Sequence, residues 1–205
     1  FLTSSSAALS SFSCGRTFLE SPYYLKRRTL VASLSELISQ RQMTENIAII
    51  QTNGLNEPEK KQVFELWNKE YPIKLSYNNL TEFDNYLKNL SNLKHFLLTS
   101  GIDLILGWAL TFDRDNDKWF AIILSENIKG KGFGRKMLEE IKNNESILNG
   151  WVIDHNNDKK QNGQQYISPL KFYEKCGFEI LSKVRLELDK ISAVKIIWKK
   201  NKACH

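Results

Sequence analysis

Long apolar runs, paired cysteines and clustered histidines are all missing from this chain of 205 residues. No apolar run approaches the roughly 18 to 20 residues that a membrane-spanning helix needs, so we expect no membrane partner. Its three cysteines cannot all pair with one another and match no metal-ligand spacing, which favours free thiols in a reducing compartment. The three histidines are scattered too, so the sequence predicts no metal site.

A dense stripe of Lys and Arg is also absent, although the formal net charge is +6. Residues 1–42 carry five basic and two acidic side chains, a net charge of +3. The rest of the chain carries 24 basic and 21 acidic side chains, again a net charge of +3. A mildly basic body suits a polyanionic ligand, but without a basic stripe on one face we expect no nucleic-acid partner.

Residues 1–42 differ in composition from everything that follows. They hold ten serines and the cluster Lys26-Arg27-Arg28, with few acids and no sustained helical or strand period. This composition is typical of a transit-type leader, but it equally fits translated sequence upstream of a start at Met43. In both cases we expect residues 1–42 to be disordered and residues 43–205 to form one domain. We predict a cytoplasmic protein, or one of an organelle matrix if residues 1–42 are a transit segment.

From Met43 onward, strand and helix patterns alternate. Apolar runs and alternating patterns predict seven strands, over residues 47–51, 95–99, 103–112, 119–124, 151–153, 178–188 and 193–198. Helical spacing and capping signals predict four helices: one after Asn56, one over residues 80–90, one after a glycine-rich loop and one from Ser168-Pro169 to Gly177. In the third strand, alternation places five side chains on one face: Leu104, Leu106, Trp108, Leu110 and Phe112.

The glycine-rich loop, Lys129-Gly130-Lys131-Gly132-Phe133-Gly134-Arg135, lies between a central strand and an amphipathic helix. Three glycines in five residues let the backbone approach a ligand closely and adopt positive φ. Their N–H groups, together with the free N–H groups of the helix start, form a cradle for phosphate. Three cationic side chains in the loop add positive charge where a pyrophosphate needs it. A glycine-rich turn without a ligand is the alternative that this loop alone leaves open.

Two well-known phosphate motifs do not fit this loop. A Walker loop requires Gly-Lys-Ser/Thr at its end, whereas Gly134 is followed by Arg135-Lys136. A dinucleotide fingerprint requires Gly-x-Gly-x-x-Gly near the start of a βαβ unit. Gly130-x-Gly132-x-Gly134 is one residue too short and follows an antiparallel meander.

The loop resembles the acyl-CoA-binding motif of the GCN5-related N-acetyltransferase (GNAT) superfamily, Gln/Arg-x-x-Gly-x-Gly/Ala. Residues 129–134 match every position but the first, where Lys129 replaces Gln or Arg. The segment Phe172-Tyr173-Glu174-Lys175-Cys176-Gly177-Phe178 resembles the family's Tyr-x-x-x-Gly-Phe segment. Together the motifs and the order of elements extend the resemblance over about residues 45–200. It implies a GNAT-like acyl-CoA N-acyltransferase fold of the α/β (α+β) class, with a mixed, mostly antiparallel sheet of about seven strands and about four helices.

The resemblance also implies a site for acetyl-CoA. Backbone groups of Ile122, Ile123 and Leu124 would pair with the pantetheine arm like an added strand. The pyrophosphate would be held by the loop residues Lys129, Gly130, Lys131, Gly132, Phe133, Gly134 and Arg135. The strand after the glycine-loop helix, residues 151–154, would splay from its neighbour and open a slot for the thioester.

Acyl transfer to an amine needs a neutral amine, stabilisation of the oxyanion and a proton for the departing thiolate. A backbone N–H near Leu124 would serve the oxyanion. The resemblance makes Tyr173 the acid that protonates the thiolate, although a packed aromatic is the simpler reading of that residue without it. Glu126, Asp154 and His155 lie near predicted strand ends and are candidates for the general base. The resemblance does not choose among them, and we place Asp154 first.

The predicted function is N-acetyl transfer from acetyl-CoA, the acyl donor substrate, to a primary amine of a small molecule or protein, by direct attack in a ternary complex. A catalytically inactive CoA-binding regulatory module of the same fold is the alternative. The polar connection over residues 154–166 and the segment over residues 67–80 would border the acceptor site. Core packing is the simpler reading of the aromatic residues Trp67, Tyr71 and Tyr77. A homodimer stays open as the assembly.

Overall fold

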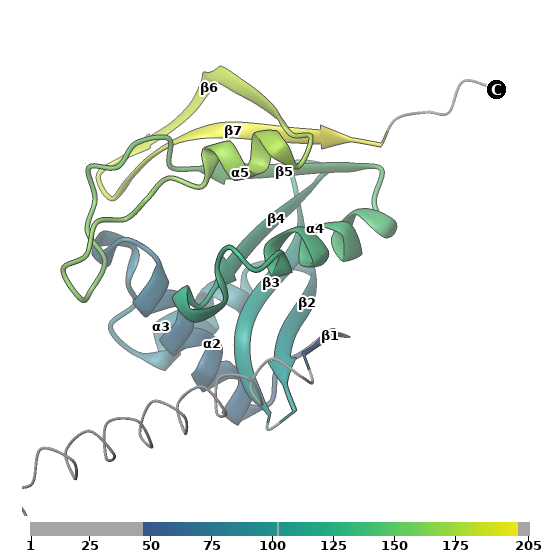
Figure 1. Ribbon diagram of the computed structural model, residues 1–205, viewed down its shortest axis with the longest axis vertical. Coiled ribbons are helices and arrows are strands. Elements are labelled where there is room, and N and C mark those ends of the chain that lie inside the picture. The colour runs from purple at the N-terminus through teal and green to yellow at the C-terminus, as the bar shows by residue number, and fades with distance from the viewer. Residues whose placement is uncertain (1–46, 102, 201–205) are drawn as a thin grey trace, which may run out of the picture. The chain divides into compact units, whose positions relative to one another are not determined.

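The computed structural model describes residues 47–101 and 103–200, and it confirms the predicted alternation of strands and helices (Figure 1). The strands are β1 (Ala48–Thr52), β2 (Ser91–Ser100), β3 (Leu104–Arg114), β4 (Asp117–Leu124), β5 (Ile147–Val152), β6 (Glu179–Leu188) and β7 (Ile191–Lys199). The helices are α2 (Glu57–Glu70), α3 (Leu80–Lys88), α4 (Phe133–Asn143) and α5 (Leu170–Lys175), with short 3-10 turns η1 (Ile73–Leu75) and η2 (Glu126–Ile128). The segment 1–42, expected to be a leader or upstream sequence, lies outside the described residues.

The described strands form one sheet in the order β1-β2-β3-β4-β5-β7-β6. Neighbouring strands are antiparallel except β4 and β5, which run parallel. The parallel pair is joined through α4, and antiparallel hairpins build the sheet on either side of it. The prediction of a mixed, mostly antiparallel sheet of seven strands is therefore confirmed.

Helices cover both faces of this sheet, and each face has its own apolar core. On one face, α4 and α5 contribute Met137, Leu138 and Tyr173 to a cluster with Phe120 of β4. On the other face, α2 and α3 pack side chains such as Trp67 and several aromatic neighbours against the sheet. In Figure 1, α4 and α5 lie in front of the sheet. Within residues 47–101 and 103–200, no helix is long and apolar enough to cross a membrane.

One detail of β3 departs from the predicted alternation. The register of β2 and β3 shifts between Leu98, which faces Gly107, and Thr99, which faces Ile105, so Leu106 is bulged out of the ladder. Leu106 consequently packs into the core under α4 and α5, while Ile105 and Trp108 share the opposite core. The prediction that Leu104 and Leu106 share a face with Trp108 is wrong because a bulge adds one residue and reverses every side chain before it.

Capping residues start the helices largely where the sequence predicts. The Asn56 side chain accepts a hydrogen bond from the Glu59 N–H at 2.9 Å, and the Glu59 carboxylate accepts one from the Asn56 N–H at 2.8 Å. This reciprocal capping box fixes the first turn of α2. At α5, Ser168 Oγ accepts from the Leu170 N–H at 3.2 Å, and the helix begins at Leu170, one residue later than predicted.

Lys142 is a buried cation that ties α4 to the end of α5. Its ammonium donates a hydrogen bond to the Cys176 carbonyl at 2.7 Å, and its side chain is 8% exposed. The same ammonium lies 5.2 Å from the ring centroid of Phe178 and 5.0 Å from that of Trp198. The contact gives a hydrogen-bond donor to the carbonyl of Cys176, the residue that caps the C-terminal end of α5, the helix that carries Tyr173.

We expect Lys142→Met to lower the free energy of unfolding by about 1.5–3 kcal/mol, because a carbonyl loses a charged hydrogen-bond donor. Urea unfolding of the full chain measures this change. The matched control is Lys136→Met, since Lys136 lies on the same helix and is exposed. Equal stability of the two variants would show that the buried contact contributes nothing.

Candidate active site

β4 and β5 are paired through their backbones at one position only. Trp119 pairs with Asn149, and the Asn149 Nδ2 group donates a hydrogen bond to the Lys118 carbonyl at 3.2 Å. Farther along, residues 122–124 pair with β3 on one side and have no described strand partner on the other. The two strands therefore diverge toward their carboxyl ends, as Figure 1 shows and as the family resemblance implies.

The bounds of β5 differ from the prediction. The strand begins at Ile147 and ends at Val152, whereas the sequence pattern predicts residues 151–153 and the resemblance residues 151–154. Its first half is buried, with Leu148 and Asn149 fully inaccessible to solvent. Gly150 is required by close packing, because a Cβ there would lie 3.0 Å from the Phe120 ring. The predicted splaying segment is thus the end of a longer strand.

The glycine loop follows the open end of β4 and leads into α4. Gly130 has a φ of 75° and Gly132 a φ of 86°. A Cβ at either position would meet no atom within 4 Å, so glycine is needed for its backbone conformation and not for space. α4 starts without a side-chain cap, and its first intrahelical bond runs from the Lys136 N–H to the Gly132 carbonyl.

The amides of Phe133, Gly134 and Arg135 accordingly have no backbone acceptor among the described residues. Free N–H groups at a helix start, at its positive end, suit a phosphate. Lys131 and Arg135 are exposed beside them and form no ion pair with another described residue. We call residues 130–135 the cradle; their free amides and two exposed cations suit an anion.

Gly134 brings three elements together. A Cβ on this residue would lie 3.0 Å from Leu124 Cδ1 and 3.1 Å from the Phe172 ring. The start of α4 can therefore pack directly on the end of β4 and on α5 only because Gly134 has no side chain. This contact fixes the cradle relative to the helix that carries Tyr173.

Lys129, at the first position of the motif, belongs to a network of four charged side chains. Its Nζ lies 2.8 Å from Glu70 Oε2 and 2.7 Å from Glu126 Oε2. Lys160 Nζ lies 2.9 Å and 2.7 Å from the same two oxygens. In addition, the Glu126 N–H donates to Glu70 Oε1 at 2.9 Å. The network joins the end of α2, the start of η2, the glycine loop and the connection between β5 and α5.

Sequence reasoning missed Glu70 and Lys160, the two buried members of this network. The Glu70 side chain is 3% exposed and that of Lys160 is 7% exposed. The one available signal was that Glu70 continues the apolar stripe of Val63 and Trp67 at helical spacing, where an acid is out of place. Lys160 gave no signal, because it lies in a polar connection without a repeating pattern.

The network weakens Glu126 as a base. Hydrogen bonds from Lys129 and then Lys160 lower the pKa of Glu126 to about 2. For Glu70, burial raises the pKa, but the hydrogen bonds from Lys129 and Lys160 outweigh burial and leave the pKa below its ordinary value. Both carboxyl groups are therefore ionised at neutral pH and accept protons poorly.

Asp154, just after β5, is held by a second ion pair. Arg185 of β6 donates to both carboxylate oxygens, at 2.9 Å and 3.2 Å, and these bonds lower the pKa of Asp154. Nearby, His155 Nδ1 accepts from the Asn157 N–H at 3.3 Å. The structure brings Glu126 and Lys129 together, while Asp154 belongs to a separate network with Arg185.

Tyr173 lies on α5 with its ring buried among aromatic side chains. The residue is 6% exposed, and its ring packs against the rings of Phe120, Phe172 and Phe178, at centroid distances of 5.8, 5.2 and 5.6 Å. Burial raises the pKa of Tyr173 well above its ordinary value. The phenol is therefore protonated at neutral pH and is a weaker acid than an exposed tyrosine.

Two further tyrosines lie near Tyr173. Tyr71, at the end of α2, and Tyr166, in the connection before α5, stack with ring centroids 6.5 Å apart. Burial, followed by the neighbouring phenols of Tyr166 and Tyr173, raises the pKa of Tyr71. Sequence reasoning named Tyr71 among the aromatic residues of the segment over residues 67–80, and it did not name Tyr166. Both residues come together through contacts that are distant in sequence.

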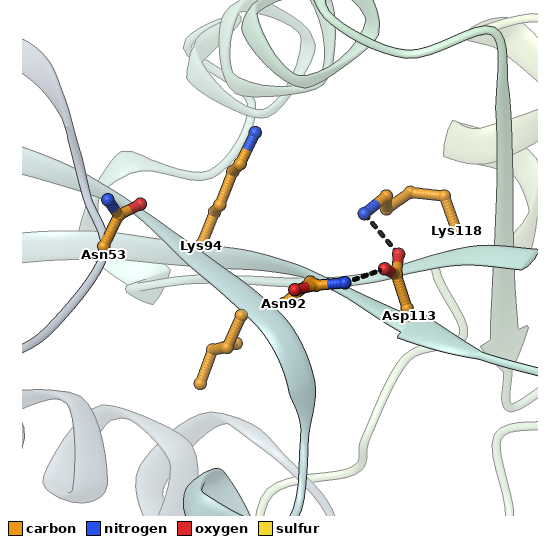
Figure 2. A pocket seen from close by; sticks show the side chains of 6 residues that line it. Asn53, Asn92, Lys94, Asp113 and Lys118 are labelled. Atoms are coloured by element: carbon orange, nitrogen blue, oxygen red, sulfur yellow. Dashed lines mark hydrogen bonds and ion pairs between the residues drawn. The ribbon is translucent and has the colours of Figure 1, made fainter.

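A surface cavity of about 420 Å³ lies elsewhere (Figure 2). Its lining residues are Asn53, Asn92, Leu93, Lys94, Asp113 and Lys118. Lys118 is at the start of β4, six residues before Leu124, so it lies about 20 Å along the strand from the end of β4 that leads to the glycine loop, at roughly 3.3 Å per residue. It contains none of the site residues predicted from the sequence. Within the described ranges, no group of three or more His, Cys, Asp or Glu side chains could hold a metal ion.

Comparison by sequence finds no relative: no protein-family model matches the chain, and no curated protein matches it. Comparison by structure finds three neighbours among others. A candidate phosphinothricin N-acetyltransferase superposes with a TM-score of 0.57 and 14% identity, covering 77% of this chain and 100% of its own. The spermidine/spermine N-acetyltransferase of Vibrio cholerae superposes with a TM-score of 0.53 and 15% identity, covering 77% of this chain and 94% of its own. The third neighbour is a phosphinothricin acetyltransferase of the GNAT superfamily from Sinorhizobium meliloti, in complex with acetyl-CoA. It superposes with a TM-score of 0.54 and 11% identity, covering 74% of this chain and 88% of its own.

The lowered pKa of Glu126 predicts a pH-dependent contribution to stability. Between about pH 4.5, the ordinary value, and about pH 2, the unfolded state binds more protons than the folded state, so this contribution disappears as pH falls. We therefore expect Glu126→Gln to be less stable than the wild type at pH 6, and the difference to shrink toward pH 2. Urea unfolding across this range measures it.

The matched control is Glu140→Gln, because Glu140 is exposed on α4 and pairs with no described cation. Its difference from the wild type should be small and flat with pH. A pH-independent difference for Glu126→Gln would mean that the ion pairs do not hold in solution.

Proposed function

We propose that this chain, which has the fold of the GCN5-related N-acetyltransferases, transfers an acetyl group from acetyl-CoA to a primary amine. The observation that carries the proposal is the anion cradle of residues 130–135 at the open end of a strand pair that stops after one position. A cradle and an unpaired strand edge, side by side, suit a ligand with a pyrophosphate and an extended amide-bearing arm. Acetyl-CoA is such a ligand.

Backbone groups supply most of the proposed donor site. The unpaired edge of Ile122, Ile123 and Leu124 would bind the pantetheine arm in the manner of an added strand. The amides of residue 130 and residues 132–135, with the side chains of Lys131 and Arg135, would hold the pyrophosphate, while the Lys131 N–H donates to the Ile128 carbonyl. Lys129 contributes through its position at the start of the loop, since its ammonium is engaged by Glu70 and Glu126.

The protein's groups would act on the acyl transfer in a defined order. A backbone N–H near Leu124 would donate to the oxygen of the attacked thioester. The amine nitrogen forms the new bond to the acyl carbon, the bond from carbon to sulfur breaks, and Tyr173 would give its proton to the departing thiolate. The raised pKa keeps that proton on Tyr173 in the free protein and also makes the phenol a weak acid, so the proposed transfer requires the departing thiolate to lie within hydrogen-bonding distance of the Tyr173 hydroxyl.

The proposed base, which takes the proton of the amine, comes from the connection after β5. Asp154 is our proposed base because it follows the splaying strand β5. Its ion pair with Arg185 makes it a weak one, so we infer that much of the activation comes from delivering the amine already neutral. His155 and Glu126 are alternatives with no stronger support, since each already accepts hydrogen bonds within the protein.

A CoA-binding module without turnover is the competing proposal. The observation in its favour is the network around Lys129, which ties the first motif position to two carboxylates. The presence of Tyr173 at the tyrosine position of the Tyr-x-x-x-Gly-Phe segment favours the enzyme. For the cellular setting, we propose the cytoplasm, or an organelle matrix if residues 1–42 are a transit segment, and a homodimer as one assembly to test.

We expect acetyl-CoA to raise the midpoint of thermal unfolding of the full chain, increasingly with concentration. A ligand at 100 times its dissociation constant stabilises the folded state by about 2.7 kcal/mol. NADH and ATP should give a smaller rise. Gly132→Ala should reduce the rise because it strains the cradle, whereas Gly54→Ala, at an ordinary φ with open space, should retain it. A folded protein with no rise in acetyl-CoA would exclude the proposed donor.

We also expect Tyr173→Phe to keep the thermal response to acetyl-CoA but to lose turnover by on the order of 10²- to 10⁴-fold, the usual contribution of an acid catalyst. Release of CoA thiol in the presence of amines measures turnover. Tyr86→Phe is the control, because Tyr86 lies on α3 in the opposite core. Unchanged turnover in Tyr173→Phe would remove this residue from the mechanism.

A further inference from the structure

The connection between β5 and α5 crosses from one arm of the splayed strand pair to the other. We call residues 154–166 the strap. The strap leaves the end of β5 and contacts the segment after α2, where the Ile73 N–H donates to the Lys159 carbonyl at 2.9 Å and Pro72 forms a bridge with Lys160. Lys74 adds an ion pair with Asp158 at 2.7 Å, and the Asp158 side chain is 5% exposed. The strap is therefore docked by specific contacts.

Lys160 connects the strap to the residues beyond the end of β4. Its ammonium lies between Glu70 Oε2 and Glu126 Oε2, and Glu126 is two residues beyond the end of β4. The side chain that reaches this position is 93% buried, from its 7% exposure. The Lys160 side chain thus links the connection that follows β5 to the residues that follow β4.

Counting charges shows what the carboxylate pair requires. Glu70 and Glu126 contribute two negative charges, and Lys129 and Lys160 contribute two positive charges, so the network is neutral. Without the Lys160 ammonium the network carries a net charge of −1. Because Glu70 is buried, an uncompensated charge there is costly, and a replacement for Lys160 must be a cation.

A nitrogen at this position is held as an ammonium. Burial disfavours the charged form, but hydrogen bonds to Glu126 and Glu70 outweigh it and raise the pKa of Lys160. A protonated amine has no lone pair with which to attack a thioester. Lys160 is therefore a poor acceptor itself, and any amine that replaced it would react through a different nitrogen.

We propose that Lys160 is a built-in occupant of an ammonium subsite formed by Glu70 and Glu126, and that the strap stays closed over the site until the cationic end of an acceptor replaces Lys160. The inference deepens the proposed function and rests on it for the role of the occupant as an acceptor. It specifies an acceptor with two basic nitrogens: one bound as an ammonium by the carboxylates and one neutral and reactive.

Binding of 1,4-diaminobutane to the full chain, followed by calorimetry at constant ionic strength, tests the proposal without acetyl-CoA. Lys160→Met removes the internal competitor. If the strap is closed in nine molecules of ten, its removal tightens binding by about tenfold. Lys159→Met is the matched control, since Lys159 is the exposed neighbour in the same strap, and its affinity should equal that of the wild type. Adding Glu126→Gln to Lys160→Met should abolish the gain.

A second measurement needs no variant and decides the matter if Lys160→Met does not fold. Opening of the strap breaks the bond of the Ile73 N–H to Lys159, so 1,4-diaminobutane should accelerate hydrogen exchange of the Ile73 amide in the wild type. Sodium chloride at equal ionic strength is the control and should leave it unchanged.

Equal affinity of the wild type, Lys160→Met and Lys159→Met would overturn the proposal. Unchanged exchange at Ile73, up to the highest diamine concentration at which the protein stays folded, would also overturn it. Both readouts are independent of acetyl transfer. Diamine binding without an acetyl-CoA response would therefore retain the subsite and reject the proposed function, and the reverse result would do the opposite.

Discussion

A parallel strand pair that stops after one position leaves two backbone edges facing each other with unused hydrogen-bonding groups, which are unfavourable unless something fills the space between them. In this chain, Trp119 and Asn149 are that one position, and the Asn149 side chain adds a bond to the Lys118 carbonyl where a second rung would be. The glycine loop, α5 and the strap are arranged around the resulting opening. The fold therefore concentrates its unpaired backbone and its loop chemistry at one end of β4.

The parts of this arrangement that the sequence predicts are those encoded locally. The glycine loop could be predicted from Gly130 and Gly132, because only glycine readily adopts the positive φ that the loop needs at these positions. The seven strands and four helices follow from apolar periods and capping residues such as Asn56. The start of β5 was missed because Asn149-Gly150 is typical of a turn, yet here it lies inside a strand, where Gly150 admits the Phe120 ring. The face of Leu106 was wrong because a bulge leaves no mark on a hydrophobic pattern.

Long-range charge pairing was beyond reach for a different reason. Glu70 and Lys160 are separated by 90 residues, and Glu126 and Lys160 by 34, so neither pair has a sequence spacing that indicates contact. The same is true of Asp154 and Arg185, which are 31 residues apart. These pairs decide how the acids of the site behave, because a carboxylate that already accepts hydrogen bonds from cations has little affinity for a further proton. The sequence could identify acidic residues near strand ends as candidate bases, but it could not show which of them form ion pairs with distant cations.

The neutral network around Lys129 also bears on how this chain can change through evolution. Its four members come from three separate stretches of sequence, since Glu126 and Lys129 are three residues apart, yet replacing any one by an uncharged residue leaves a net charge in a partly buried place. Substitutions there should be tolerated best in compensating pairs, so we expect positions 70, 126, 129 and 160 to vary together. A lysine at the first position of the glycine motif is then the counterpart of an acid that α2 buries 59 residues earlier.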